Sequence, residues 1–313
     1  MTTVAAIDCG TNSIRLLILR AEAGDVVELA REVRLARLGQ GVDATGEFHP
    51  DALGRADVIF EEYAGIIARH GVTDVRFVAT SAARDVSNRE TFEALVRGRL
   101  GVEVDVISGD EEALLSTRGV LSGVHADTPA LVFDIGGGST ELIVVDQGPT
   151  IRSAISLDIG AVRVKERLMP SDPATVDEVA AARAYVGGLL DGAGVDFSGL
   201  ASAIGVAGTV TSVAASVLGL DSYSRQAVHE TLLARTDIEA TVGRWLGQTA
   251  AETAAEPCMH PLRAVVLGAG GLILDEISRR VPGGAVLVSE TDILDGIALG
   301  LLHGPAARAD TAG

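Results

Sequence analysis

The chain has 313 residues, enough for two domains that each bury a hydrophobic core. Its net charge is −18, since 43 aspartates and glutamates outnumber 25 lysines and arginines. This charge argues against a protein that binds nucleic acid or an anionic membrane through a basic surface. Aromatic residues make up 3% of a chain that is 47% hydrophobic, so aliphatic side chains must form most of the core.

The cysteines and the apolar runs argue against two further classes. Cys9 and Cys258 lie far apart in the sequence, which gives neither a disulfide framework nor the spacing of a zinc site. No apolar run reaches membrane-spanning length, and the N-terminus enters a strand pattern without the basic region of a signal peptide. We therefore expect a cytoplasmic protein that contacts neither nucleic acid nor a membrane.

In the first part of the chain, apolar strand patterns alternate with helical patterns, which predicts an α/β fold. The stretch 51–70 has apolar residues at three- and four-residue spacing, and Gly71 supplies its stop. Ser108 followed by Glu111 is the signature of a capping box and marks another helix start. The predicted elements are strands at 4–6, 14–19, 33–41, 74–79 and 102–107, and helices at 51–70, 88–100 and 108–121.

The second part repeats this rhythm after a short polar segment at 124–128, which we expect to cross between domains. Thr236 and Glu239 form another capping-box pattern. Residues 304–313 are small or polar and are expected to form a disordered tail. The predicted elements are strands on both sides of 134–141 and at 151–157, 201–207, 263–267 and 284–288, and helices at about 173–190, 210–218, 236–246, 271–280 and 292–302.

The stretch ALVFDIGGGSTELIVV, at 130–145, organises the second half. Two apolar runs flank a glycine-rich break, which predicts a β-hairpin with a tight loop. Glycines let the backbone approach a ligand closely and point its N–H groups at an anion. Asp134 at the end of the strand is a candidate ligand for Mg²⁺, directly or through water. The alternative is a hairpin turn that needs glycine only for its backbone conformation.

A second copy of this pattern at 4–18, VAAIDCGTNSIRLLI, favours the interpretation as a ligand-binding loop. Aligning the two stretches places Asp8 on Asp134 and Gly10 on Gly136. Internal repetition of this kind predicts two related halves, each with a phosphate-sized loop. The pattern resembles the superfamily of actin, sugar kinases and the large heat-shock chaperones, whose duplicated domains each carry such a loop. Two loops that face each other across a cleft would clamp a phosphoanhydride.

Further transitions from a predicted strand to a glycine-rich segment occur at 205–211 and 268–271. In open α/β sheets, ligands bind beyond the carboxyl ends of strands. Four such transitions, two of them with related sequences, are hard to assign to turn geometry alone.

Glu112 is the candidate general base, because it lies in the first turn of the helix that begins after Ser108. The N-terminal end of a helix dipole favours the carboxylate form that a base needs. Acidic residues in first turns are also routine capping residues, and Glu111 fits that role better.

Arg84 is a candidate phosphate ligand at the end of a predicted strand. A guanidinium can bind two phosphate oxygens at once and stabilise charge in phosphoryl transfer. The alternative is a surface arginine that pairs with Asp85. Arg15 and Arg37 are weaker candidates, since each could be a solvated strand residue.

Four motifs in this order, AAIDCGTNSIRLLI, ATSAARD, ISGDEEA and DIGGGSTELIV, resemble the exopolyphosphatase/guanosine pentaphosphate phosphohydrolase (Ppx/GppA) family. The resemblance extends from about Ala5 to Leu302, and the chain is similar to the short, two-domain class without the C-terminal helical region of longer members. It implies a duplicated actin-like (ribonuclease H-like, ASKHA) two-domain α/β fold with the active site in the interdomain cleft. It also implies Mg²⁺-dependent hydrolysis of a terminal phosphoanhydride.

The resemblance assigns the catalytic glutamate to Glu112 and the phosphate-binding arginine to Arg84. Together with the loop pattern, it gives phosphate-binding positions and ligands for Mg²⁺, with Mn²⁺ as the alternative metal. The phosphate-binding positions are Gly10, Thr11, Asn12, Ser13, Gly136, Gly137, Gly138, Ser139 and, beside them, Arg15. The metal ligands are Asp134, Glu141 and Asp8.

We therefore expect domains at 1–123 and 130–291, with the helix at 292–302 packing back on the first domain. The expected reaction is hydrolysis of the terminal phosphate of inorganic polyphosphate, short chains in particular, by a homodimer. The nearest alternative substrate is guanosine pentaphosphate. A kinase on the same fold and a non-catalytic binder of polyphosphate or of an alarmone stay open as further alternatives.

Overall fold

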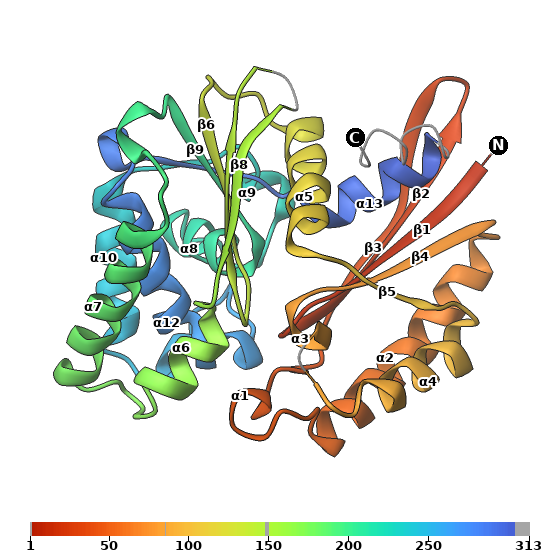
Figure 1. Ribbon diagram of the computed structural model, residues 1–313, viewed down its shortest axis with the longest axis horizontal. Coiled ribbons are helices and arrows are strands. Elements are labelled where there is room, and N and C mark those ends of the chain that lie inside the picture. Colours follow the sequence, from red (N-terminus) through yellow and green to blue (C-terminus); the bar gives the residue numbers. More distant parts are fainter. Residues whose placement is uncertain (1, 85, 148–149, 304–313) are drawn as a thin grey trace. The chain divides into compact units, whose positions relative to one another are not determined.

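The computed structural model describes residues 2–84, 86–147 and 150–303 (Figure 1). The predicted disordered tail at 304–313 lies outside the described residues. Contacts between residues divide the chain into two compact units. The first unit consists of the chain up to Ser122 together with the segment that begins at Asp292, and the second extends from Gly123 to Thr291. The chain therefore passes between the units twice.

The first unit is built on a five-stranded sheet with the strand order β3-β2-β1-β4-β5. β2 is antiparallel to β1 and β3, whereas β4 is parallel to β1 and β5. β1, β3, β4 and β5 therefore run in one direction, and their carboxyl ends meet at one edge of the sheet. The strands are β1 Thr2–Cys9, β2 Ser13–Glu22, β3 Asp25–Leu35, β4 Asp74–Ala79 and β5 Val104–Val106.

Helices cover both faces of this sheet, which explains the nearly continuous apolar sequence of β1. Side chains alternate along the strand, so that Ala5 joins a core with α2 and α4 and Ala6 joins a core with α13. In the first of these cores, Phe60 packs edge-on against Phe77, with ring centroids 5.5 Å apart. The helices are α1 Val42–Thr45, α2 Pro50–Arg69, α3 Ser81–Arg84, α4 Arg89–Leu100, α5 Gly109–Gly123 and α13 Ile293–Leu302.

The second unit is built on a six-stranded sheet with the order β10-β11-β9-β6-β7-β8. β7 is antiparallel to β6 and β8, and β9 is parallel to β6 and β11. The order β8-β7-β6-β9 repeats the order β3-β2-β1-β4 of the first unit, which confirms the predicted duplication. The strands are β6 Ala130–Ile135, β7 Thr140–Val145, β8 Ile151–Leu157, β9 Ser202–Val206, β10 Leu232–Leu233 and β11 Val286–Val288.

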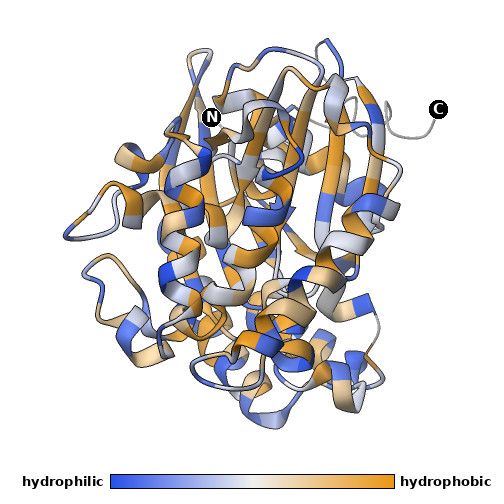
Figure 2. Cartoon of the chain, turned by 90° about the vertical axis from the view of Figure 1, so that its left-hand side faces the viewer, coloured by the Kyte–Doolittle hydropathy of each residue, from blue (hydrophilic) through white to orange (hydrophobic). Residues whose placement is uncertain are grey.

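The largest core of the second unit gathers around α12, most of whose residues are buried. In Figure 2 the strands are mainly hydrophobic, while hydrophilic segments concentrate on helices and loops. None of the helices among the described residues is long and apolar enough to cross a membrane. The helices of this unit are α6 Ala161–Leu168, α7 Val176–Gly192, α8 Ala207–Val217, α9 Arg225–Val228, α10 Arg235–Leu246, α11 Ala250–Ala254 and α12 Pro261–Ser278.

The predicted strand at 263–267 and the glycine loop at 268–271 are wrong, because α12 passes through both. A helix that is buried on most sides has no polar face, so its apolar run cannot be told from a buried strand by periodicity. The glycines serve close packing instead of a turn: a β-carbon on Gly270 would lie 2.4 Å from the Thr209 Oγ1 atom.

The structure supports the cap in one of the two predicted capping boxes and contradicts the other. Ser108 caps α5, since its hydroxyl accepts a hydrogen bond from the Glu111 N–H at 3.2 Å. The box predicted for Thr236 and Glu239 is wrong, because α10 already begins at Arg235 and its N-cap makes no side-chain hydrogen bond.

Candidate active site

The two glycine-containing loops adopt the same turn. In the first unit, the N–H of Gly10 donates to the carbonyl of Ser13 at 3.0 Å, and in the second, the N–H of Gly136 donates to the carbonyl of Ser139 at 3.0 Å. Each loop joins the first two strands of its sheet. The predicted repeat therefore corresponds to a structural equivalence, and each loop lies at the edge where the parallel strands end.

In the first unit, the segment after β3 braces the loop. The N–H of Gly39 donates to the carbonyl of Thr11 at 2.7 Å, and the N–H of Arg37 donates to the carbonyl of Asn12 at 2.9 Å. A β-carbon on Gly39 would lie 2.0 Å from the Thr11 Cγ2 atom, so this approach requires glycine. The segment after β3 thus fixes two carbonyl groups of the loop.

In the second unit, the start of α6 has the equivalent role. The N–H of Val162 donates to the carbonyl of Gly137 at 2.9 Å. A β-carbon on Gly160 would lie 2.3 Å from the Gly137 carbonyl oxygen and 2.5 Å from the Gly138 nitrogen. The first turn of the helix therefore packs directly on the backbone of the loop and fixes its peptide planes.

The second loop also holds a run of amide groups. The N–H groups of Gly137, Gly138 and Ser139 donate to no acceptor within the part of the chain that the structure describes. Successive amides of this kind form a concave nest that binds anions. Thr140, which follows, donates its hydroxyl to the carbonyl of Ile159 and so anchors the end of the loop. The loop can thus offer several amides to phosphate oxygens.

Two carboxylates lie on neighbouring strands at the base of the second loop. Asp134 of β6 is the register partner of Glu141 of β7. Glu141 is 3% exposed and accepts a hydrogen bond from the Ser156 hydroxyl at 2.8 Å, whereas Asp134 is half-buried. The structure therefore brings together two of the three predicted metal ligands.

The third predicted ligand, Asp8, lies at the end of β1 and binds Arg15. The Arg15 Nε donates to Asp8 Oδ2 at 2.9 Å, and its Nη1 donates to Asp292. Asp292 is the N-cap of α13, with its Oδ1 accepting from the N–H of Leu294 at 2.9 Å. Sequence reasoning missed Asp292, because its partner lies 277 positions away and its local pattern is that of an ordinary cap.

Burial makes Asp8 unusual, since the side chain is almost inaccessible. Burial raises the pKa of Asp8 above its ordinary value, although Arg15 opposes the shift. Asp8 Oδ1 and Asn12 Oδ1 are buried acceptors without a hydrogen-bond partner in the described structure. Two orphaned oxygens in one loop are costly unless a ligand satisfies them.

These donors fit a hard divalent cation. Among the described residues, no three His, Cys, Asp or Glu side chains gather closely enough to form a metal site by themselves. Mg²⁺ commonly takes one or two carboxylates and completes its shell with water and substrate phosphates. In the first unit, the carboxylate of Asp8 and the orphaned oxygen of Asn12 are of this chemical type. In the second unit, so are the carboxylates of Asp134 and Glu141.

Glu112 lies in the first turn of α5, as predicted, and is 8% exposed. The Nη2 of Arg84, at the end of α3, donates to Glu112 Oε2 at 3.1 Å. α3 follows β4 and α5 follows β5, so both side chains start from the sheet edge that carries the first loop. The alternative partner for Arg84, Asp85, lies outside the described residues.

Glu111 shows the alternative role of an acidic residue in the same turn. Its side chain is 40% exposed and binds Arg76 at 2.6 Å. Its backbone N–H donates to the hydroxyl of Ser108, which caps the helix. The two adjacent glutamates therefore differ: Glu111 belongs to a surface ion pair, and Glu112 is buried beside Arg84.

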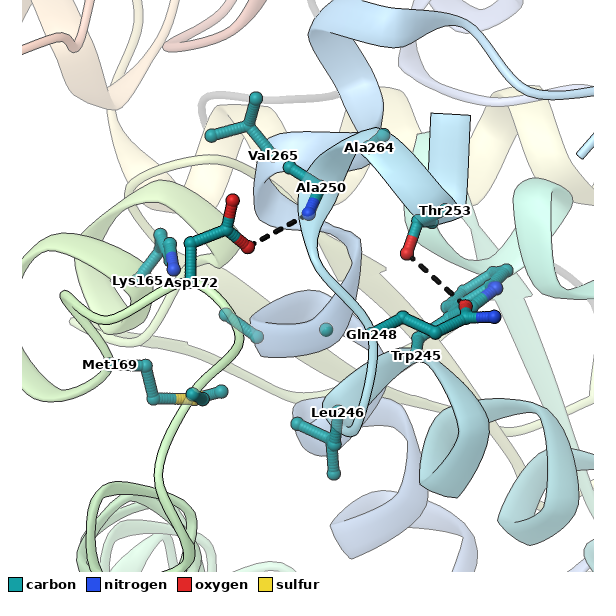
Figure 3. Close-up of a pocket in the computed structure, with 13 residues that line it drawn as sticks. Lys165, Met169, Asp172, Trp245, Leu246, Gln248, Ala250, Thr253, Ala264 and Val265 are labelled. Atoms are coloured by element: carbon teal, nitrogen blue, oxygen red, sulfur yellow. Dashed lines mark hydrogen bonds between the residues drawn. The ribbon is translucent and has the colours of Figure 1, made fainter. Parts of the chain in front are cut away.

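The strand exit at 205–211 exists, but it forms no glycine loop, because α8 begins directly at Ala207. A small cavity lies elsewhere in the second unit, next to the 268–271 stretch (Figure 3). It has a volume of about 30 Å³ and is bordered by Lys165, Asp172 and Gln248. Such a volume holds a water molecule and not a nucleoside. It contains none of the predicted site residues.

Together these features define a class: a duplicated actin-like α/β protein with a phosphate-type loop in each unit and a buried glutamate paired with an arginine. The chain belongs to the Ppx/GppA phosphatase family, which matches residues 17–304. This confirms the resemblance found in the sequence motifs.

Individual relatives are similar over nearly the whole chain. Exopolyphosphatase 2 of Mycobacterium tuberculosis is 42% identical over 96% of this chain and 99% of its own length. The crystal structure of an exopolyphosphatase-like protein gives a TM-score of 0.91 at 40% identity, covering 96% of this chain and 97% of that one. An exopolyphosphatase from Cytophaga hutchinsonii gives a TM-score of 0.88 at 26% identity, covering 97% and 98%. The predicted fold class, in its short two-domain form, is thereby confirmed.

Proposed function

We propose that this chain is an exopolyphosphatase, which hydrolyses the terminal phosphoanhydride of inorganic polyphosphate and releases orthophosphate. The ion pair between Arg84 and Glu112 carries the proposal, because it joins a base and a phosphate ligand beside a phosphate-type loop. The 42% identity to an exopolyphosphatase over nearly the full length of both chains supports the substrate.

The loops bind the phosphate chain in this proposal. The amides of Gly137, Gly138 and Ser139 donate to phosphate oxygens, and residues 10–13 contribute from the first unit. Arg84 turns part of its guanidinium from Glu112 to the terminal phosphate, where it offsets charge that develops during transfer. The proposal thus requires both loops to act on one phosphate chain.

Glu112 activates the attacking water. The water oxygen forms a bond to the terminal phosphorus, and its proton passes to the carboxylate of Glu112. The bond from that phosphorus to the bridging oxygen breaks, and this oxygen leaves with the shortened chain. Burial of Glu112 beside a cation keeps the carboxylate in place for this step.

Asp8, Asp134 and Glu141 are the residues that would hold Mg²⁺, or Mn²⁺, with Asn12 as a further oxygen donor. When bound, such an ion would neutralise phosphate charge and make the phosphorus more electrophilic. The positioning of these carboxylates is the protein's contribution: Arg15 holds Asp8, and Ser156 holds Glu141.

Guanosine pentaphosphate is the alternative substrate, and the same residues would act on its terminal phosphate. Its guanine would need a subsite, and the cavity near 268–271 is too small for one. The kinase and the non-catalytic binder are disfavoured by the buried pair of Glu112 and Arg84. A homodimer and a cytoplasmic location stay predictions of the sequence.

A substrate comparison tests the proposal. Phosphate release is measured in the presence of Mg²⁺ from short polyphosphate, long polyphosphate and guanosine pentaphosphate. Release from polyphosphate at the highest kcat/KM supports the proposal. A higher kcat/KM for the nucleotide would assign the site to the alarmone, and no release from any substrate by folded protein would overturn a hydrolytic function.

A further inference from the structure

Arg37 differs from most arginines of the first unit, because its guanidinium makes no hydrogen bond or ion pair with any described residue. Arg15, Arg31, Arg34, Arg76 and Arg84, for comparison, all bind carboxylates. Arg69 also has no such partner, but it is exposed on the last turn of α2. Arg37 is half-buried. A guanidinium that no protein group occupies keeps its N–H donors available to a ligand.

The backbone around Arg37 is held firmly against the first loop. The N–H of Arg37 donates to the carbonyl of Asn12, and the Arg55 Nε donates to the carbonyl of Ala36 at 2.8 Å. Ala36 and Leu38, on either side, are fully buried in the core. Arg37 is thus the charged residue in a short segment whose neighbours anchor it.

Arg37 also has a left-handed backbone, with φ 51°. This conformation is unfavourable for a residue with a β-carbon relative to the right-handed one. Glycine would adopt it without that cost. Strain of this kind is retained where the surrounding structure imposes it, and it gathers at functional sites.

The sheet topology places Arg37 on one side of the first loop and the catalytic pair on the other. Arg37 follows β3, the loop joins β1 to β2, Arg84 follows β4 and Glu112 follows β5. The strand order is β3-β2-β1-β4-β5, and β1, β3, β4 and β5 end at the same edge. A phosphate chain whose end lies beside Arg84 and Glu112 would therefore meet Arg37 further along its length.

We propose that Arg37 binds a phosphate of the polyphosphate chain other than the one that is cleaved. The inference rests on the proposed function and adds a determinant of chain length to it. A guanidinium suits this role, because its fork of donors matches two phosphate oxygens and its charge offsets theirs. Chains that are long enough to reach Arg37 gain affinity from it, and the shortest chains do not.

The test compares Arg37→Gln with Arg69→Gln. Glutamine retains the β-carbon, so the backbone strain at position 37 stays and only the guanidinium is lost. Arg69→Gln removes the same charge from an arginine of the same unit that has no hydrogen-bond partner and lies at the far end of α2. KM and kcat are measured with tripolyphosphate and with long polyphosphate, and the unfolding midpoint is measured for each variant.

We expect Arg37→Gln to raise KM for long polyphosphate by about tenfold or more, the loss of one charge-assisted contact. Its kcat, its KM for tripolyphosphate and its unfolding midpoint should stay near those of Arg69→Gln. Equal KM values of the two variants for long polyphosphate would overturn the inference, and so would an equal rise with tripolyphosphate.

Failure of the proposed function can be separated from failure of this inference. If the unchanged protein releases no phosphate from any polyphosphate, the proposed function fails. Calorimetric titration of both variants with long polyphosphate then decides the role of Arg37. Weaker binding by Arg37→Gln than by Arg69→Gln would support it, and equal binding would overturn it.

Discussion

The Nη2 of Arg84 lies 3.1 Å from Glu112 Oε2, although the two residues are 28 positions apart and come from different helices. Both side chains are largely withdrawn from water: 26% of the Arg84 side-chain surface and 10% of that of Glu112 are exposed. The pairing holds the carboxylate in one orientation, and in the proposed mechanism it places a cation where charge develops on the phosphate. Base and phosphate ligand thus form one structural element of the proposed site.

Arg84→Gln should lower kcat by about 10³-fold, in the range that a transition-state arginine contributes to phosphoryl transfer. The matched control is Arg89→Gln, which removes an arginine from a surface pair with Glu93. Steady-state kinetics with polyphosphate measures both. A similar kcat for the two variants would show that Arg84 has only a structural role.

Gly160→Ala should lower kcat/KM by about 10²-fold, because its β-carbon would lie 2.3 Å from the Gly137 carbonyl oxygen and displace the second loop. The control is Gly188→Ala in α7, where nothing lies within 4 Å and alanine should slightly stabilise the helix. Circular dichroism checks that both variants fold. Full activity of folded Gly160→Ala would contradict the bracing role of the start of α6.

Asp8→Asn should change the pH dependence of stability. Because burial raises the pKa of Asp8 in the folded protein, the unfolded chain loses this proton first. The contribution of Asp8 to stability is therefore complete below its ordinary pKa of 3.8 and is lost as the pH rises through the raised value. In metal-free buffer, the unfolding midpoint of Asp8→Asn relative to the unchanged protein should increase from pH 4 to pH 7.

Asp57→Asn provides a control of opposite sign. A hydrogen bond from Arg99 lowers the pKa of Asp57, so its contribution is present above pH 3.8 and is lost as the pH falls. The midpoint of Asp57→Asn relative to the unchanged protein should decrease slightly as the pH rises. If Asp8→Asn followed the same trend as Asp57→Asn, the raised pKa of Asp8 would be wrong.

Local patterns predicted the parts of the fold that short-range interactions determine. The hairpins around both loops follow from apolar runs that flank glycines, and the cap of Ser108 on α5 follows from a three-residue spacing. The strand predicted at 263–267 failed, because tertiary burial removed the polar face that marks a helix. Propensity and periodicity carry no information on such burial.

Sequence motifs were sufficient to name Glu112 and Arg84 as candidates, and the structure pairs them, while their roles in the reaction stay predictions. The residues that hold the site in place could not be found from a local motif. Asp292 reaches Arg15 from the last helix, and Gly160 packs on a loop that lies more than twenty positions earlier. Both depend on how distant segments fold together.

The central claim is that Glu112 activates the water that attacks the terminal phosphate. Its most direct test compares kcat and KM for polyphosphate in Glu112→Gln and in Glu111→Gln, the adjacent residue whose ion pair with Arg76 lies at the surface. We predict that Glu112→Gln lowers kcat by at least about 10²-fold with little change in KM, as expected for loss of a general base. Glu111→Gln should keep nearly full activity. Near-normal turnover of Glu112→Gln, or an equal loss in both variants, would contradict the account.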